Sequence, residues 1–282
     1  MDTIKKYVTT MLAAVALLSL GSCVKDDLYA TPHPDKGALV VTADFSELTE
    51  GIAVPDGYVV SVAGKDYSAS SSAAFICPDL LPQGEYGVMA YNQPEGITII
   101  GNLASAIISG GTANPLPGYL YSYSGQVDVE ADDTTRLTMP MAQRVRDFYI
   151  RFTVSEGDVG RVEDVSGVIS GVAGGFNLEN RSVSGEAVDV EPAFSVNGDA
   201  VTSHLRLFGV RGGSQVLTLN VAFADGTLQT VESDITEFLQ NFGSDMLTPL
   251  EMRGNLLLPL SAGFNITITD LETGEVENVD LY

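Results

Sequence analysis

Apolar and polar residues alternate along much of the chain, with a repeat of two positions. The alternation is clearest in residues 148–154 (FYIRFTV), 217–223 (LTLNVAF) and 264–269 (FNITIT). Successive side chains of a β-strand point to opposite faces, so each run has one apolar and one polar face. The pattern predicts strands of antiparallel sheets, with one face on a core and the other in water.

Further short runs follow the same period and are separated by turn-forming residues. These predicted strands cover residues 39–45, 58–62, 85–91, 119–129, 136–141, 204–210 and 276–281. Gly, Pro, Asn and Asp fill the gaps, as in Pro55-Asp56-Gly57 and Asn197-Gly198-Asp199. The turn Ala224-Asp225-Gly226 lies between two strand-like runs and predicts a hairpin.

One segment departs from this period and predicts a short helix. Ser233 is expected to cap it, Asp234 and Glu237 lie in its first turn, and Gly243 suits its exit. Its apolar positions fall at helical spacing: Ile235, Phe238, Leu239 and Phe242. We expect the helix to pack on the end of a sheet.

The predicted elements indicate an all-β fold with two domains. About a dozen short strands are too many for one compact sandwich. The chain is therefore expected to form two tandem β-sandwiches, residues 39–142 and 143–282, which meet near residues 142–146. No low-complexity linker separates them, so the two domains are expected to abut.

The amino terminus has the three-part layout of a secretory signal peptide. Lys5 and Lys6 precede an apolar run, residues 11–20, and the small residues Gly21 and Ser22 follow. This run is about half the length needed to span a bilayer, so a transmembrane helix is the weaker alternative. The signal peptide is expected to comprise residues 1–22.

The segment Leu20-Gly21-Ser22-Cys23 resembles the lipobox of bacterial lipoproteins. The resemblance implies cleavage between Ser22 and Cys23, followed by acylation of the Cys23 thiol and of the new amino group. An ordinary secretory signal with a cysteine near its cleavage site is the alternative. One acyl chain binds a membrane only marginally, whereas several chains attach a protein stably. The mature protein is therefore expected to stay on a membrane.

The residues after the cysteine are expected to form an unpacked tether, residues 23–38. Lys25-Asp26-Asp27 resembles the export signal of surface lipoproteins of the Bacteroidales, with a solvated charged tether as the alternative. Extended chain rises about 3.3 Å per residue, so residues 24–38 span up to about 50 Å. The amino-terminal residues thus predict that the protein is attached to a membrane and that a spacer separates the lipid from the first strand.

The charge balance of the chain is strongly acidic. Removing residues 1–22 takes two lysines and one aspartate from 14 basic and 37 acidic residues, which leaves 12 and 36 and a formal charge of −24. Such a charge repels nucleic acid and anionic membrane surfaces. With Cys23 acylated, Cys77 has no partner for a disulfide, and we expect a small buried side chain there, with a reactive thiol as the alternative.

Candidate catalytic and metal-binding residues are few. The two histidines, His33 in the tether and His204 in a strand, lack the spacing of a zinc site, and no nucleophile motif is present. Asp132-Asp133 and Asp225 are expected to lie in solvated turns, because neither has the ligand spacing of a dedicated calcium loop. Calcium binding at either position is the alternative. The sequence predicts no catalytic residue, no metal and no cofactor.

Two other features invite a functional interpretation. The glycine-rich segment 170–185, SGVAGGFNLENRSVSG, lacks the lysine of a phosphate-binding loop, and we interpret it as an ordinary loop. Tyr119, Tyr121 and Tyr123 alternate along one strand, which predicts a sheet surface or an interface, with ligand stacking as the alternative. The chain has no tryptophan, which argues against a stacking platform for sugars.

Four stretches resemble the fimbrial anchor and accessory lipoproteins of the Bacteroidales, the FimB/Mfa-like superfamily with its uncharacterised relatives. They are LGSCVKDD, HPDKGALVVTADFS, LPQGEYGVMAYNQPEGITI and MPMAQRVRDFYIRFTV. The resemblance implies two tandem transthyretin-like, Greek-key β-sandwiches and a role as stalk, anchor or tip subunit of a surface pilus.

The resemblance also implies assembly by donor-strand exchange, in which a sandwich that lacks one strand accepts a strand from the next subunit. Stalk subunits of the superfamily lose an amino-terminal segment by proteolysis. Here the first arginine is Arg136, deep in the predicted fold, and loss of the first strand would also release the lipid. This favours a membrane-held subunit. The tail, residues 266–282, either folds back as a hairpin or is donated onward.

The leading hypothesis is a lipid-anchored, non-enzymatic protein of the outer membrane and cell surface. It would serve as an anchor or accessory subunit of a fimbrium (pilus). Its expected partners are the membrane through the lipid, pilin subunits, and a host glycan or matrix protein. The alternative is a stand-alone surface adhesin or glycan-binding lipoprotein that does not polymerise. A third reading, a surface hydrolase, requires a cleft with two close carboxylates.

Overall fold

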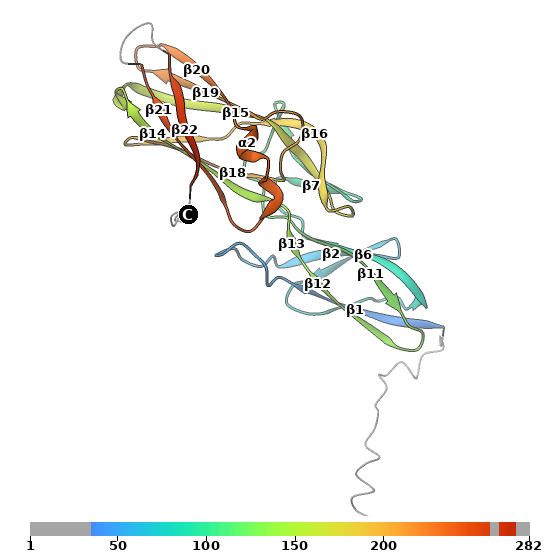
Figure 1. The fold of residues 1–282 in the computed structure, drawn as a ribbon. Coiled ribbons are helices and arrows are strands. Elements are labelled where there is room, and N and C mark those ends of the chain that lie inside the picture. The colour runs from blue at the N-terminus through green and yellow to red at the C-terminus, as the bar shows by residue number, and fades with distance from the viewer. Residues whose placement is uncertain (1–34, 260–264, 275–282) are drawn as a thin grey trace, which may run out of the picture.

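β-Strands dominate the described part of the chain, where they form four sheets (Figure 1). The computed structural model describes residues 35–259 and 265–274. Within these residues the only helical segments are short: η2 (Val159–Arg161), α2 (Thr236–Leu239) and η3 (Phe242–Ser244). The sheets pack in pairs around hydrophobic cores, which confirms the predicted all-β sandwich fold.

Two sheets enclose the core nearest the amino terminus. The first has the order β12-β1-β4, with β5 also paired to β1: β1 (Lys36–Asp44), β4 (Phe75–Ile76), β5 (Leu81–Pro82) and β12 (Thr134–Pro140). The second has the order β13-β11-β6-β2-β3: β2 (Gly57–Val62), β3 (Lys65–Ser70), β6 (Gly84–Tyr91), β11 (Tyr121–Val129) and β13 (Ala142–Gln143). Their inner faces bury alternate side chains such as Leu39, Val41 and Val60.

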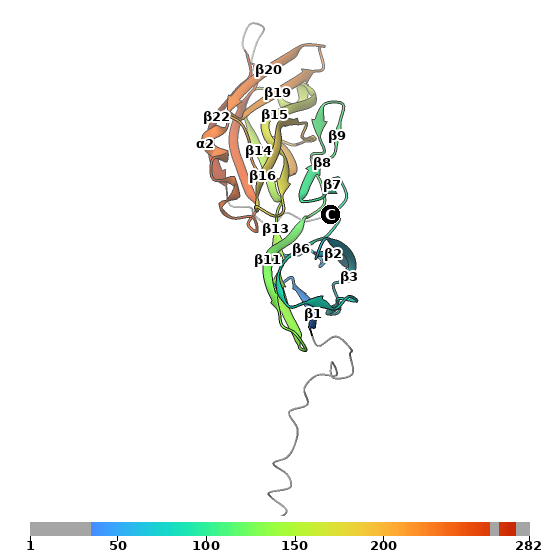
Figure 2. The ribbon, with the colours of Figure 1, turned by 90° about the vertical axis from the view of Figure 1, so that its right-hand side faces the viewer.

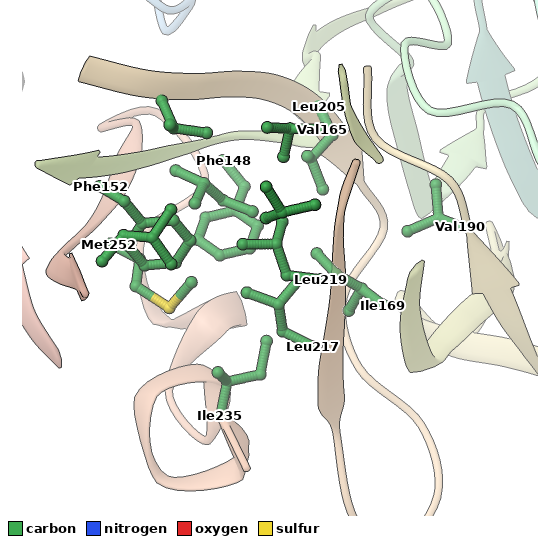
Figure 3. Packing of buried hydrophobic residues seen from close by; sticks show 14 of the residues in the cluster. Phe148, Phe152, Val165, Ile169, Val190, Leu205, Leu217, Leu219, Ile235 and Met252 are labelled. Atoms are coloured by element: carbon green, nitrogen blue, oxygen red, sulfur yellow. The ribbon is translucent and has the colours of Figure 1, made fainter. Parts of the chain in front are cut away.

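Two larger sheets enclose the second core. One has the order β17-β18-β14-β21-β22: β14 (Arg146–Glu156), β17 (Phe194–Asn197), β18 (Ala200–Leu207), β21 (Leu250–Leu257) and β22 (Thr267–Gly274). The other runs β20-β19-β15-β16-β10-β9 and also holds β7 and β8: β7 (Ile97–Ile100), β8 (Leu103–Ala106), β9 (Ile108–Ser109), β10 (Thr112–Ala113), β15 (Val162–Asn177), β16 (Ser182–Val190), β19 (Val216–Phe223) and β20 (Leu228–Asp234). In the core between them, Phe148 and Phe152 of β14 lie near Leu217 and Leu219 of β19 (Figure 3).

The period-two pattern located most of the long strands. The runs at 39–45, 58–62, 85–91, 119–129, 136–141, 148–154 and 217–223 correspond to β1, β2, β6, β11, β12, β14 and β19. The turn at residues 224–226 joins β19 to β20 as the predicted hairpin, with Gly226 at φ 83°. Not every pair is antiparallel, because β1–β12, β14–β21 and β10–β16 are parallel.

The glycine-rich segment 170–185 is not a loop, so that interpretation was wrong. It forms the end of β15 and the start of β16, joined by a turn. The glycines serve close packing of backbones, since a Cβ on Gly175 would lie 2.5 Å from the carbonyl oxygen of Ala104 in β8. At Gly175 the backbone of β8 thus lies closer to β15 than a side chain would allow.

Replacing Gly175 with alanine tests this contact. The added methyl group would push β8 away from β15, and we expect a loss of about 2 kcal/mol in the free energy of unfolding, as for overpacking in a dense core. Gly213→Ala is the control, because a Cβ there meets nothing within 4 Å. Urea denaturation measures both variants. Equal stability of Gly175→Ala and wild type would contradict the assignment.

A third core links the two pairs of sheets. β8 and β10 precede the predicted domain boundary in sequence, yet they pair with β15 and β16 (Figure 2). Side chains from both halves of the chain meet there, among them Tyr91, Leu120, Val145 and Phe176. The boundary at residues 142–143 itself remains a prediction.

The predicted helix is shorter than expected. Ser233 belongs to β20 and caps nothing, while the Asp234 carboxylate accepts the backbone N–H of Thr236 at 2.9 Å. α2 makes a single turn because the backbone leaves the helical conformation at Asn241, with φ −106° and ψ 21°, just before η3. The apolar positions still pack as expected, since Ile235 and Leu239 are buried in the core of the adjacent sheets.

Candidate functional site

The residues predicted to carry the lipid and the export signal lie outside the described part of the chain. They are Ser22, Cys23, Lys25, Asp26 and Asp27. Their roles stay predictions. None of the helices that the structure describes has the length and apolar character of a membrane-spanning helix.

The first described strand, β1, occupies an inner position in its sheet. It runs parallel to β12 from Ala38 to Asp44 and antiparallel to β4 and β5 on its other side. We call these three flanking strands the β1 seat. Leu39 and Val41 point into the core with 1% and 0% of their surface exposed, whereas Thr42 is exposed. The alternation of apolar and polar residues thus places one face of β1 on the core and the other toward solvent.

The turn that carries Asp132 and Asp133 secures the start of β1. The Asp132 backbone N–H donates to the carbonyl of Lys36, and the N–H of Ala38 donates to the carbonyl of Asp133, both at 2.9 Å. The Asp133 carboxylate accepts the N–H of Thr134. No group of three potential metal-ligating side chains occurs among the described residues. The backbone of this turn therefore forms hydrogen bonds with the backbone of β1.

The described carboxy-terminal strand pairs within the chain. β22 forms an antiparallel pair with β21 and is the last strand of its sheet in the described residues. Its register shifts opposite Arg253 and Asn255, and Asp270 adopts a left-handed φ of 53°. The predicted strand at residues 276–281 lies outside the described chain.

A buried polar cluster joins the two halves of the chain. Asp147, at the start of β14, has 2% of its surface exposed, and its carboxylate accepts three hydrogen bonds. Tyr119 donates its hydroxyl at 2.5 Å, Arg206 donates Nε at 2.9 Å, and His204 Nε2 lies at 2.7 Å. We call these four residues the junction cluster. His204 is a strand residue, as predicted, and His33 lies outside the described chain.

The electrostatics of the junction cluster favour an ionised carboxylate. Burial by itself raises the pKa of Asp147, but the hydrogen bonds from His204, Tyr119 and Arg206 outweigh burial and hold the pKa below its usual value. Arg206 also donates to the carbonyl of Pro117 at 2.7 Å. The cluster thus ties the segment before β11 to β14 and β18.

A second polar contact at the junction holds the segment after α2. The buried side chain of Gln143 accepts the Thr49 hydroxyl at 3.0 Å and donates to the carbonyl of Met246 at 2.7 Å. Arg146 donates to the carbonyls of Thr248 and Phe242 at 2.6 and 2.8 Å. These bonds connect residues far apart in the sequence, so the sequence alone could not reveal them.

Tyr119, Tyr121 and Cys77 all contribute to the packing of the chain. Tyr121 is buried in the amino-terminal core with 1% exposed, so the sheet-surface interpretation was wrong for it. Tyr119 is partly buried and lies at the interface between the halves. Cys77 is buried with 4% exposed, as the sequence predicted.

Comparison with known proteins relates this geometry to one family and one fold. The family described as "Fimbrillin-A associated anchor proteins Mfa1 and Mfa2" matches residues 51–282. No curated protein matches the sequence.

Among solved structures, the chain is similar to a proposed adhesin from Bacteroides ovatus, with a TM-score of 0.62, 19% identity, and coverage of 84% of this chain and 94% of that one. It is also similar to the fimbrial anchor protein Mfa2 from Porphyromonas gingivalis, with a TM-score of 0.59, 10% identity, and coverage of 84% and 97%. At these identities the similarity shows the fold.

Proposed function

The chain belongs to the family of fimbrillin-A associated anchor proteins Mfa1 and Mfa2, and from this premise we propose that it is a lipid-anchored anchor or accessory subunit of a fimbrium. After removal of residues 1–22, the Cys23 thiol carries a diacylglycerol and the new amino group carries palmitate. The subunit is held at the outer membrane, on the cell surface, and contacts pilin subunits. Its role is structural and adhesive.

The inner position of β1 is the observation that carries this proposal. The tether from Cys23 leads into a strand that is paired on both edges and whose alternate side chains are buried. A pull on the fimbrium would load β1 along its length, so the hydrogen bonds of the β1 seat must break together rather than one by one. A strand held in this way suits a subunit that bears the load between lipid and fibre.

The same strand supports the proposal of a base subunit rather than a stalk subunit. Arg136, the first arginine of the sequence, lies opposite Val40 in the sheet, within β12. An arginine-specific protease therefore has no site before β1. Removal of β1 would open the core and would also separate the fold from the proposed lipid. The proposal thus keeps β1 in place in the assembled fimbrium.

Contact with the next subunit would use a sheet edge. Within the described residues, β3, β17, β20 and β22 each end the order of a sheet. An edge strand offers unpaired N–H and C=O groups that can accept a strand from another chain. The next subunit is proposed to donate such a strand.

Replacing Cys23 with serine in the native cells tests the proposal. Serine cannot form the thioether, so we expect the variant to incorporate no labelled palmitate and to be lost from the cell surface. Fimbriae should then be shed into the medium or altered in length. Radiolabelled palmitate, protease treatment of whole cells and electron microscopy measure these three results.

Cys77→Ala is the matched control, because Cys77 is the only other cysteine and is buried. This variant should keep its palmitate and its attached fimbriae. Firmly attached fimbriae of normal length on cells with Cys23→Ser would contradict the proposal. Loss of surface protein without any change in fimbriae would favour the stand-alone adhesin.

A further inference from the structure

A cleft of about 660 Å³ lies on the outer face of the sheet formed by β17, β18, β14, β21 and β22. Its floor includes Tyr149 and Arg151, which alternate along β14 with the buried core residues. Ile52 and Leu116 from the first half of the chain also line it. Ligand sites commonly have this size and lie between two halves of a protein.

Two arginines line this cleft although the chain is acidic. The chain holds 14 basic and 37 acidic residues, yet Arg151 and Arg206 both line the cleft. Glu251, with 3% of its surface exposed, accepts Arg151 Nε at 2.9 Å and also a hydrogen bond from Arg253. The buried carboxylate thereby fixes the orientation of the Arg151 guanidinium.

The terminal nitrogens of Arg151 remain available to a ligand. The side chain is 46% exposed, and within the described residues only its Nε has a hydrogen-bond partner. A guanidinium offers a planar fork of N–H groups that matches a carboxylate in two parallel hydrogen bonds. Glu251 thus holds Arg151 by its Nε, and the terminal N–H groups of the guanidinium stay open to an anion.

Further uncommitted donors line the same cleft. Tyr149 is 9% exposed, its ring stacks on His204 at 4.3 Å, and its hydroxyl has no partner among the described residues. Burial raises the pKa of Tyr149 to about 12, so the phenol stays protonated and can donate. The hydroxyls of Ser195 and Thr202, also in the lining, have no partner in the described part of the chain either.

We propose that this cleft binds a carboxylate-bearing saccharide, such as a uronic acid unit, with the carboxylate on Arg151. The hydroxyls of Tyr149, Ser195 and Thr202 match the hydroxyls of a sugar, and the apolar side chain of Ile52 suits the C–H face of a pyranose ring. Because Asp147 and Glu251 lie beside the cleft, a single negative charge is favoured over a dianion such as a phosphate. The inference is independent of lipid attachment and fimbrial assembly.

The test compares digalacturonate with its dimethyl ester, which keeps the sugar and removes the charge. Calorimetry on the purified full-length protein should show binding of digalacturonate and at least a tenfold weaker binding of the ester, roughly the worth of a charge-assisted pair. Arg151→Gln should raise the dissociation constant of digalacturonate by about tenfold. Tyr149→Phe should raise it by about threefold, the worth of one neutral hydrogen bond.

Arg161→Gln is the matched control, because Arg161 is 41% exposed and pairs with Asp225 away from the cleft. Its binding should equal that of wild type. Circular dichroism checks that each variant is folded. If Arg151→Gln is not folded, the binding measured for Tyr149→Phe tests the proposal in its place. The proposal is overturned if the ester binds as well as the acid or if Arg151→Gln binds normally. It also fails if digalacturonate, glucuronate and N-acetylneuraminate all fail to bind at millimolar concentration.

Discussion

Replacing Val41 with aspartate is expected to unfold the amino-terminal sandwich. Val41 lies at the centre of β1 with 0% of its surface exposed, and its neighbours in the core are apolar. A carboxylate there would lose its hydration without gaining a partner. We expect a loss of at least about 4 kcal/mol, which is a large share of the stability of a typical domain. Urea denaturation followed by far-ultraviolet circular dichroism measures the loss.

Thr42→Asp is the matched control, because the adjacent side chain points to the opposite face of β1 and is exposed. It introduces the same charge one position away and should leave the unfolding midpoint nearly unchanged. Equal losses in the two variants would show that β1 does not bury alternate side chains in the β1 seat. The proposal that β1 bears the load between the lipid and the fimbrium would then lack its structural basis.

Replacing Asp147 with asparagine is expected to produce the second largest loss of stability. Asparagine keeps the shape of the side chain, but it removes the charge that pairs with Arg206 and turns one acceptor into a donor. Removing one partner of a buried ion pair leaves the other charge uncompensated, which typically costs 3–5 kcal/mol. We expect a loss of about 3 kcal/mol in the free energy of unfolding, because Arg206 keeps its bond to Pro117.

The pH dependence of the Asp147 contribution follows from the direction of its pKa. The folded protein holds this pKa below its usual value, so the stabilisation is fully present above the pKa of an unfolded aspartate, about 3.9. It is lost as the pH falls from there through the lower folded pKa. Wild type should therefore lose more stability than Asp147→Asn on acidification below about pH 4.

Asp225→Asn serves as the control for this prediction. Asp225 is exposed and lies 3.5 Å from Arg161, so its ion pair is screened by solvent. The variant should unfold at the same denaturant concentration as wild type. A loss as large as that of Asp147→Asn would mean that general charge, and not the junction cluster, controls stability.

The local pattern of apolar and polar residues predicted the strands that bury one face on a core. β19 alternates between buried and half-buried positions, and β14 alternates between buried and exposed positions from Ile150 to Thr153, so the sequence pattern marked both strands. β3 was missed because only Tyr67 and Ala69 of its sequence, KDYSAS, pack against the core, and both are only half-buried. β15 was missed because its glycines are typical of loops, and their purpose appears only when β8 lies beside them. Pairing between distant segments leaves no local signal.

The candidate site divides in the same way. The lipobox at Cys23 is a local motif and could be recognised, although it lies outside the described residues. The junction cluster depends on the register that sets Asp147 opposite Arg206, and on a loop that brings Tyr119 to the same carboxylate. The signal available in the sequence was the polar face of β14. It indicated exposure to water, whereas the structure places another part of the chain over it.

The length of β15 has a mechanical consequence. Its first half contributes Val165 and Ile169 to the core of the larger sandwich, and its second half contributes Ala173 and Phe176 to the core shared by both halves. One strand thus passes from the larger sandwich into the core shared by both halves, with an irregularity at Gly171, and β8 pairs with its far end. Bending at this point would tear strand pairing as well as side-chain contacts. In the proposed fimbrial role, this bracing would keep the end of the subunit that meets the fibre at a constant distance from the membrane.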